Sequence, residues 1–364
     1  MRKNAKKNYS AAVNFAALVL TVLILFFAAI SCGCTESYGT ASDNFVPENS
    51  DKNSDKNSDK NSDKNSDINS DKNSEKNPGN FSYSIISDSF IFDDEEPQFA
   101  YANGIKTGYK QAGEGPHLVM VMGYAAGMDA WSPSLLNSLA ENYTVTIFDN
   151  RGAGLSGPGD IQPENMTYEI YADDTAALMD ALGIKKAYLF GWSMGTAISQ
   201  ELLLKYPDRV EKAVLYAPYY SLSSPGQEHL REYLRIVAYN EVTESDVYEN
   251  MFPKEWLLCN KPAKYLPSSQ PVSQRGILAE YHAGLNWNGT LNRLSRINIP
   301  VLLTAGSDDS LTPPEYLRAM AEEIDGSWTA EFKGAGHGLM YQNPNVLADT
   351  VRFFLEIDED LSCV

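Results

Sequence analysis

The stretch Leu189-Phe190-Gly191-Trp192-Ser193-Met194-Gly195 joins an apolar run to a segment with helical spacing. Residues 186–190 predict a short buried strand that stops at Gly191, and residues 196–206 predict a helix. Between them lies the pattern G-x-S-x-G. In a sharp strand-to-helix turn, this pattern lifts a strained serine hydroxyl clear of the sheet, at a helix N-terminus that favours developing negative charge. An ordinary Gly-Ser turn is the alternative, but the flanking strand and helix favour Ser193 as a nucleophile.

The composition indicates a globular, acidic protein. The 364 residues are 43% hydrophobic and carry a formal net charge of -19, which argues against nucleic acid as a partner. No group of histidines and cysteines has the spacing of metal ligands.

Residues 1–34 have the pattern of an export signal, with a basic start, an apolar run and small residues at its end. Residues 29–32 resemble the lipobox of prokaryotic lipoproteins, which makes Cys32 the candidate lipidation site, and Cys34 is a second candidate. An uncleaved membrane anchor or simple secretion are the alternatives. A lipoprotein, an anchored protein and a secreted protein all have their folded domain outside the cytoplasm. Lipidation or an anchor would also hold the protein at the cell membrane.

Residues 35–80 are predicted to be a disordered linker. From Asp51 they repeat Asp-Lys-Asn-Ser, and a four-residue polar repeat has no apolar face to bury. We interpret this segment as a tether that spaces a folded domain, residues 81–364, from a surface.

The folded domain alternates strands with helices after an initial hairpin. A hairpin is expected at residues 99–110, with its turn at Asn103-Gly104. Strands are predicted at residues 117–122, 144–148, 186–190, 210–216, 301–305 and 328–332, and helices at residues 132–142, 168–182, 196–206, 314–323 and 344–355. This order predicts an α/β fold, a mostly parallel sheet with helices on both faces.

Residues 219–298 interrupt the alternation and are too long for a plain loop. They contain helical segments, such as residues 273–284, and many aromatic side chains. We interpret them as a helical cap over the site. Most of the aromatic residues are expected to form the small core of the cap itself, and a few to line a pocket.

A serine nucleophile needs a base, and the base needs an acid that fixes its tautomer. His337 lies between glycines in a loop after the last predicted strand, a better position than those of the other histidines. Asp308 and Asp309 follow the strand at residues 301–305, and either could supply the acid.

Several motifs together resemble the α/β-hydrolase fold superfamily, in its capped serine hydrolase branch. They are the D-x-R-G-x-G-x-S loop at residues 149–156, the nucleophile turn, the loop Gly306-x-x-Asp309 followed by Pro313, the pair Gly336-His337, and the chain order serine, aspartate, histidine. The resemblance implies Asp309 rather than Asp308 as the acid. It also implies that the backbone N–H groups of Tyr124 and Met194 form the oxyanion hole. The family usually has His-Gly before this loop, whereas this chain has Met122-Gly123.

These residues predict an extracytoplasmic serine hydrolase that cleaves an ester or related acyl bond of a small, apolar substrate, with no cofactor or metal. Ser193, Asp309 and His337 would be the catalytic residues. Esterase, lactonase, aminopeptidase, C–C hydrolase and perhydrolase activities share these motifs. The alternative is a non-catalytic binding protein, tethered to a surface, on a hydrolase scaffold.

Overall fold

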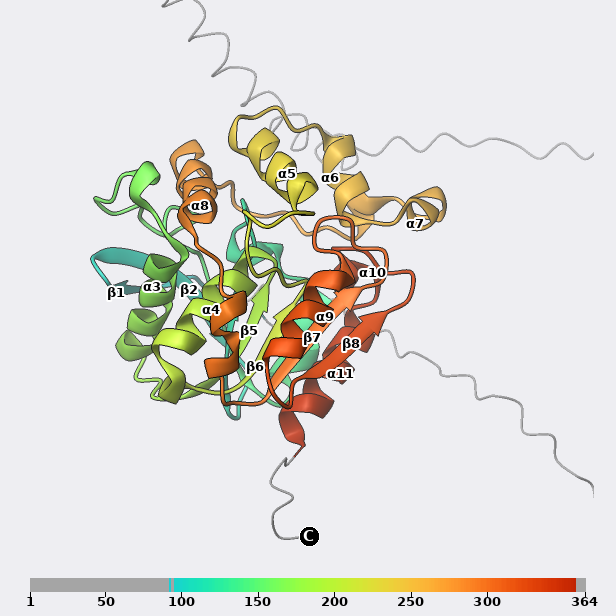
Figure 1. The fold of residues 1–364 in the computed structure, drawn as a ribbon. Coiled ribbons are helices and arrows are strands. Elements are labelled where there is room, and N and C mark those ends of the chain that lie inside the picture. The colour runs from blue at the N-terminus through green and yellow to red at the C-terminus, as the bar shows by residue number, and fades with distance from the viewer. Residues whose placement is uncertain (1–91, 93–94, 358–364) are drawn as a thin grey trace, which may run out of the picture. The chain divides into compact units, whose positions relative to one another are not determined.

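The computed structural model describes residue 92 and residues 95–357. Within them, one sheet of eight strands runs in the order β1-β2-β4-β3-β5-β6-β7-β8. The strands are β1 (Gln98–Ala102), β2 (Ile105–Ala112), β3 (His117–Val121), β4 (Thr144–Phe148), β5 (Ala187–Trp192), β6 (Val210–Tyr216), β7 (Val301–Gly306) and β8 (Trp328–Phe332). The predicted α/β fold is confirmed, because β3 to β8 pair in parallel and helices cover the sheet (Figure 1).

The antiparallel edge is the predicted hairpin. β1 pairs with β2, and β2 pairs in turn with β4, both antiparallel. Asn103 and Gly104 both have positive φ angles, 46° and 75°, as a two-residue turn between antiparallel strands requires.

Two buried clusters lie on the two faces of the sheet. On β3, Val119 and Val121 belong to one cluster, while Leu118 and Met120 belong to the other, because successive side chains point to opposite faces. The first cluster takes in α3 (Tyr168–Ala181), α4 (Met194–Lys205) and α9 (Pro314–Glu323). The second takes in α2 (Pro133–Ala140), α10 (Leu339–Gln342) and α11 (Pro344–Glu356).

The described residues also form short 3-10 turns, which are η1 (Met128–Ala130), η2 (Pro163–Asn165), η3 (Pro207–Arg209), η4 (Pro262–Lys264) and η5 (Leu291–Arg296).

The boundary between β5 and α4 differs from the sequence prediction. β5 continues to Trp192, because Gly191 and Trp192 still pair with Leu215 and Tyr216 of β6. α4 begins at Met194, directly after Ser193, so a single residue makes the turn from strand to helix.

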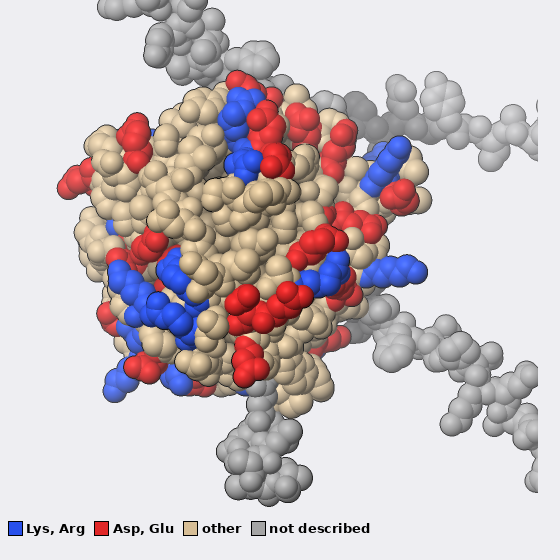
Figure 2. Space-filling model, in the orientation of Figure 1, with Lys and Arg blue, Asp and Glu red and all other residues tan. Residues whose placement is uncertain are grey.

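The segment between β6 and β7 contains α5 (Glu228–Ala238), α6 (Glu244–Met251), α7 (Lys254–Cys259) and α8 (Gln274–Asn286), and Figure 1 shows these helices gathered at one end of the sheet. Acidic and basic groups lie side by side over α5, where Arg235 pairs with Glu232 and Glu241 (Figure 2). Exposed pairs of this kind contribute little to stability.

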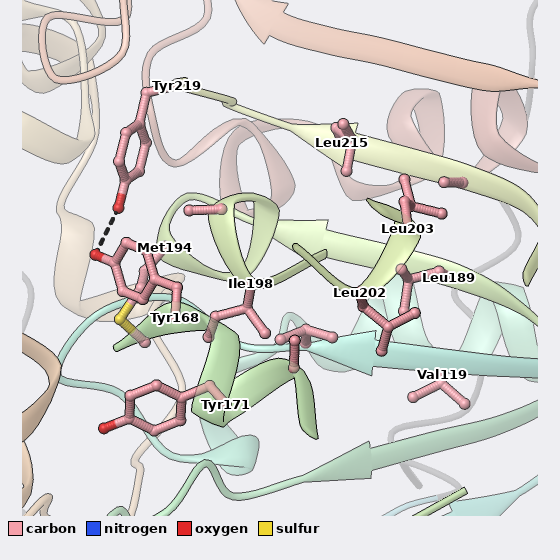
Figure 3. Packing of buried hydrophobic residues seen from close by; sticks show 14 of the residues in the cluster. Val119, Tyr168, Tyr171, Leu189, Met194, Ile198, Leu202, Leu203, Leu215 and Tyr219 are labelled. Carbon is pink, nitrogen blue, oxygen red and sulfur yellow. Dashed lines mark hydrogen bonds between the residues drawn. The ribbon is translucent and has the colours of Figure 1, made fainter. Parts of the chain in front are cut away.

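Some aromatic residues of this segment pack on one another, as Trp256 does on Phe252 and Tyr265, whereas others join the segment to the body of the domain. The rings of Tyr219 and Trp287 lie 5.7 Å apart, and that of Tyr168 lies 5.3 Å from Trp287. The hydroxyls of Tyr168 and Tyr219 are hydrogen-bonded at 2.9 Å (Figure 3). All three side chains belong to the buried cluster that contains α4, so these aromatics fix the segment to the body of the domain.

The predicted signal (residues 1–34, with Cys32 and Cys34) and linker (residues 35–80) lie outside the described residues. Among the residues that are described, none of the helices is long and apolar enough to cross a membrane.

A buried ion pair ties the loop after β4 to α3. Arg151 Nε donates to Asp174 Oδ2 at 2.8 Å, and Arg151 also donates to the carbonyl of Asn103 in the hairpin turn. Both side chains of the pair are more than nine-tenths buried. Removing one partner would leave the other charge buried without compensation.

Asp174→Ala is therefore expected to lower the free energy of unfolding by about 3–5 kcal/mol, measured by urea denaturation. Asp173→Ala is the matched control, since Asp173 is the neighbouring residue and pairs with the half-exposed Lys205. It should cost less than about 1 kcal/mol. Equal losses in the two variants would contradict the importance of the buried pair.

Candidate active site

Ser193 lies at the sharp turn between β5 and α4. Its backbone has φ 53° and ψ -117°, a strained conformation for a residue other than glycine. The flanking glycines make the turn possible. A Cβ at Gly191 would lie 2.5 Å from the carbonyl oxygen of Gly195, and a Cβ at Gly195 would lie 2.1 Å from that of Val121. Both contacts are too short for a carbon atom, so only glycine fits at either position.

His337 and Asp309 come from the loops after β8 and β7, and the structure brings them together. His337 Nδ1 lies 2.8 Å from Asp309 Oδ2, and both side chains are buried. Asp308 is exposed and accepts a hydrogen bond from Ser307, so it does not share this position.

The Asp309 carboxylate has a full set of hydrogen-bond donors. Oδ1 accepts from the backbone N–H groups of Leu311 and Thr312, both at 2.9 Å. Oδ2 accepts from the Thr312 hydroxyl at 2.9 Å, in addition to its contact with His337. Such donors fix the orientation of the carboxyl group. Sequence reasoning missed Thr312, although its place three residues after Asp309 is typical of a side chain that closes a turn.

Tyr216, the last residue of β6, holds the backbone of His337 in place. The Tyr216 hydroxyl donates to the His337 carbonyl at 2.6 Å and accepts from the Met340 N–H. The Trp192 ring, 5.6 Å from the imidazole, places His337 beside the end of β5. No hydrogen bond joins the Ser193 hydroxyl to His337 within residues 95–357, and such contacts are often long without substrate.

The loop after β3 packs directly against the Ser193 turn. A Cβ at Gly123 would lie 3.4 Å from Ser193 Cβ, so Tyr124 follows at the edge of the site. Met194 opens α4, and its N–H therefore has no carbonyl one turn earlier to bond. The two predicted oxyanion donors thus belong to segments that meet at Ser193.

Two carboxyl groups hold the loop after β3 in place. Asp149 Oδ1 accepts from the Met128 N–H at 2.7 Å, and Glu280 Oε2 accepts from the Ala125 N–H at 2.7 Å. Burial raises the pKa of Asp149 to about 6 and that of Glu280 to about 8. Sequence reasoning missed Glu280. An acid among the apolar residues of a predicted helix was the available signal.

One cavity lies among residues that do not include Ser193. It has a volume of about 630 Å³ and is lined by residues of η1, α2 and α10 and by residues 264–268. Within the described part of the chain, no cluster of three histidine, cysteine or acidic side chains could hold a metal ion.

Comparison with known proteins agrees with this arrangement. The profile of the α/β hydrolase fold family matches residues 116–344, which is more than half of the chain. A putative carbamate hydrolase of Azorhizobium caulinodans is 26% identical over 72% of this chain and 99% of its own length. A 2-hydroxy-6-oxo-6-phenylhexa-2,4-dienoate hydrolase of Comamonas testosteroni is 24% identical over 64% of this chain and 85% of its own length.

A solved structure shows the same fold. A thermophilic esterase of Thermogutta terrifontis superposes with a TM-score of 0.61 at 23% identity, and the match covers 71% of this chain and 98% of that chain. The relatives are hydrolases, and the matched region includes Ser193, Asp309 and His337. The chain belongs to the α/β-hydrolase fold family.

Proposed function

We propose that this hydrolase cleaves an ester or related acyl bond through Ser193, with His337 as its base and Asp309 as the acid that orients the base. The observation that carries the proposal is the buried hydrogen bond between His337 Nδ1 and Asp309 Oδ2 beside the strained Ser193 turn. A buried imidazole whose Nδ1 is bound to a carboxylate presents Nε2 as the proton acceptor.

The reaction would proceed in two halves. Ser193 Oγ attacks the carbonyl carbon while His337 takes the hydroxyl proton, and the N–H groups of Tyr124 and Met194 stabilise the oxyanion. The intermediate collapses, and His337 gives its proton to the leaving group. Water then attacks the acyl-enzyme with His337 again as base, which releases the acid and restores Ser193.

Apolar surroundings favour a small, apolar acyl group. Met194 belongs to the same buried cluster as Tyr168 and Tyr219, and Figure 3 shows the three side chains beside one another. The names of two relatives give a carbamate and 2-hydroxy-6-oxo-6-phenylhexa-2,4-dienoate as substrates, so the panel of substrates should include these compounds besides esters and lactones.

Ser193→Ala should lower kcat on a responsive p-nitrophenyl acyl ester by about 10⁴-fold or more, and should abolish labelling by a fluorophosphonate probe. The nucleophile is lost, while the fold keeps its glycine turn. A folded wild-type chain that shows neither turnover nor labelling would favour the alternative of a non-catalytic binding protein.

Asp309→Asn should lower kcat by about 10⁴-fold, since an amide cannot hold the imidazole in the required tautomer. Asp308→Asn, one residue away and exposed, is the matched control and should stay within about twofold of the wild type. Steady-state kinetics on the same ester measures both. If the two variants exchanged these results, the acid would have to be reassigned to Asp308.

We also propose that the protein acts outside the cytoplasm, held at the membrane by lipid on Cys32, on the basis of the signal-like pattern of residues 1–34. Cys32→Ala should abolish incorporation of labelled fatty acid into the protein, while Cys34→Ala should not. Intact-mass analysis should find a lipidated N-terminus at Cys32. A membrane-bound chain that retains Met1 would instead indicate an uncleaved anchor.

A further inference from the structure

Glu280 is a buried acid without a basic partner in its hydrogen bonds. It lies on α8 and has no exposed surface. Its Oε2 accepts the Ala125 N–H at 2.7 Å, across 155 residues of sequence, and its Oε1 is buried with no hydrogen-bond partner among the described residues. Burying a carboxyl group with an unpartnered oxygen costs free energy. A buried acid that is nevertheless present at this place is therefore a candidate for a functional role.

Ala125 occupies a position where its orientation matters. It has φ 55°, which is unusual for a residue with a side chain, and it directly follows Tyr124, whose N–H is the proposed oxyanion donor. The peptide that joins Tyr124 to Ala125 is planar, so fixing the Ala125 N–H restricts the backbone of Tyr124.

A second contact links the same loop to the same helices. The Tyr124 hydroxyl donates to the Leu234 carbonyl of α5 at 3.1 Å and lies 3.5 Å from the Ile277 carbonyl of α8. The loop after β4 also contacts this loop, since Asn150 donates to the Met122 carbonyl and Asp149 accepts from the Met128 N–H. The loop after β3 is therefore held both by the loop after β4 and by α5 and α8.

We propose that Glu280 is a positioning residue for the oxyanion loop: by holding the Ala125 N–H, it directs the Tyr124 N–H toward the oxyanion formed at Ser193. This inference deepens the proposed serine hydrolase function and rests on it. It makes the helices between β6 and β7 part of the machinery that stabilises the transition state.

The protonation state of Glu280 gives the inference a specific signature. Burial raises its pKa to about 8, helped by the negative charge of Asp149, so the neutral acid prevails at pH 7. The groups that face it are also acids or phenols: Asp149 after β4, Tyr124 after β3, Tyr168 and Tyr171 on α3, and Tyr219 after β6. Two further groups lie beyond this first set: Tyr233 of α5 is near Tyr124, and the Arg151–Asp174 pair is near Tyr171. The element η2, which packs against α8, carries Glu164, and this side chain is exposed.

Above pH 8 the carboxylate would place a negative charge beside the loop that must stabilise an oxyanion. Like charges in a buried site repel strongly, so kcat of the wild type should fall as pH rises through about 8.

Three variants of the full-length chain test the inference. Glu280→Gln keeps an oxygen for the Ala125 N–H and cannot ionise. It should retain kcat within about threefold at pH 7 and lose the alkaline fall in the pH profile. Glu280→Leu removes the acceptor and should lower kcat by about 10- to 100-fold with KM within about twofold. Leu285→Gln, at an exposed position of the same helix, is the control and should match the wild type.

Amide hydrogen exchange provides a readout that does not depend on turnover. Exchange in a peptide spanning residues 122–128 should rise about tenfold in Glu280→Leu and stay unchanged in Glu280→Gln and in the control. The inference is overturned if Glu280→Leu keeps the kcat of the wild type, if its exchange is unchanged, or if Glu280→Gln shows the same alkaline fall. A wild type without turnover or probe labelling would be recognised separately as failure of the proposed function, and the inference would fall with it.

Discussion

The strained backbone of Ser193 is the constraint on which the rest of this structure depends. A non-glycine residue at φ 53° stays there only when its surroundings leave it no alternative. Here the surroundings are the C-terminal end of β3 and the first turn of α4. The end of β3 lies so close to Gly195, and the first turn of α4 so close to Gly191, that neither position has room for a side chain. The central strand, the helix that follows it and the loop after β3 all meet at this one junction.

The polar groups of the site are held by strand ends rather than by long side chains. In a parallel sheet, the carboxyl ends of the strands meet along one edge, so the loops after β3, β5, β7 and β8 converge although they are distant in sequence. Tyr216 at the end of β6 supports the His337 backbone from within the sheet, and Thr312 completes the contacts of Asp309. Buried polar groups with satisfied hydrogen bonds keep one orientation.

The helices between β6 and β7 contact the rest of the domain at two places, the buried core and the loop after β3. Tyr219 and Trp287 join them to the core through Tyr168 of α3, which fixes their place on the domain. Glu280 and the Tyr124 hydroxyl then connect α8 and α5 to the loop beside Ser193. The same helices therefore contact both the core of the domain and the loop beside Ser193.

By itself, the sequence determined the strands, the hairpin, the turn at Ser193 and the helices other than α5, α6, α7 and α10, because alternation of apolar residues and glycine requirements are local properties. It also named Asp309 and His337 as candidates, with family resemblance choosing between Asp308 and Asp309. Only the tertiary structure decided which of these aspartates lies at 2.8 Å from His337, that Tyr219 and Trp287 belong to the core of the domain, and that Glu280 holds the Ala125 N–H. These contacts join residues far apart in the chain, and no local pattern encodes where two distant segments meet once the sheet has folded.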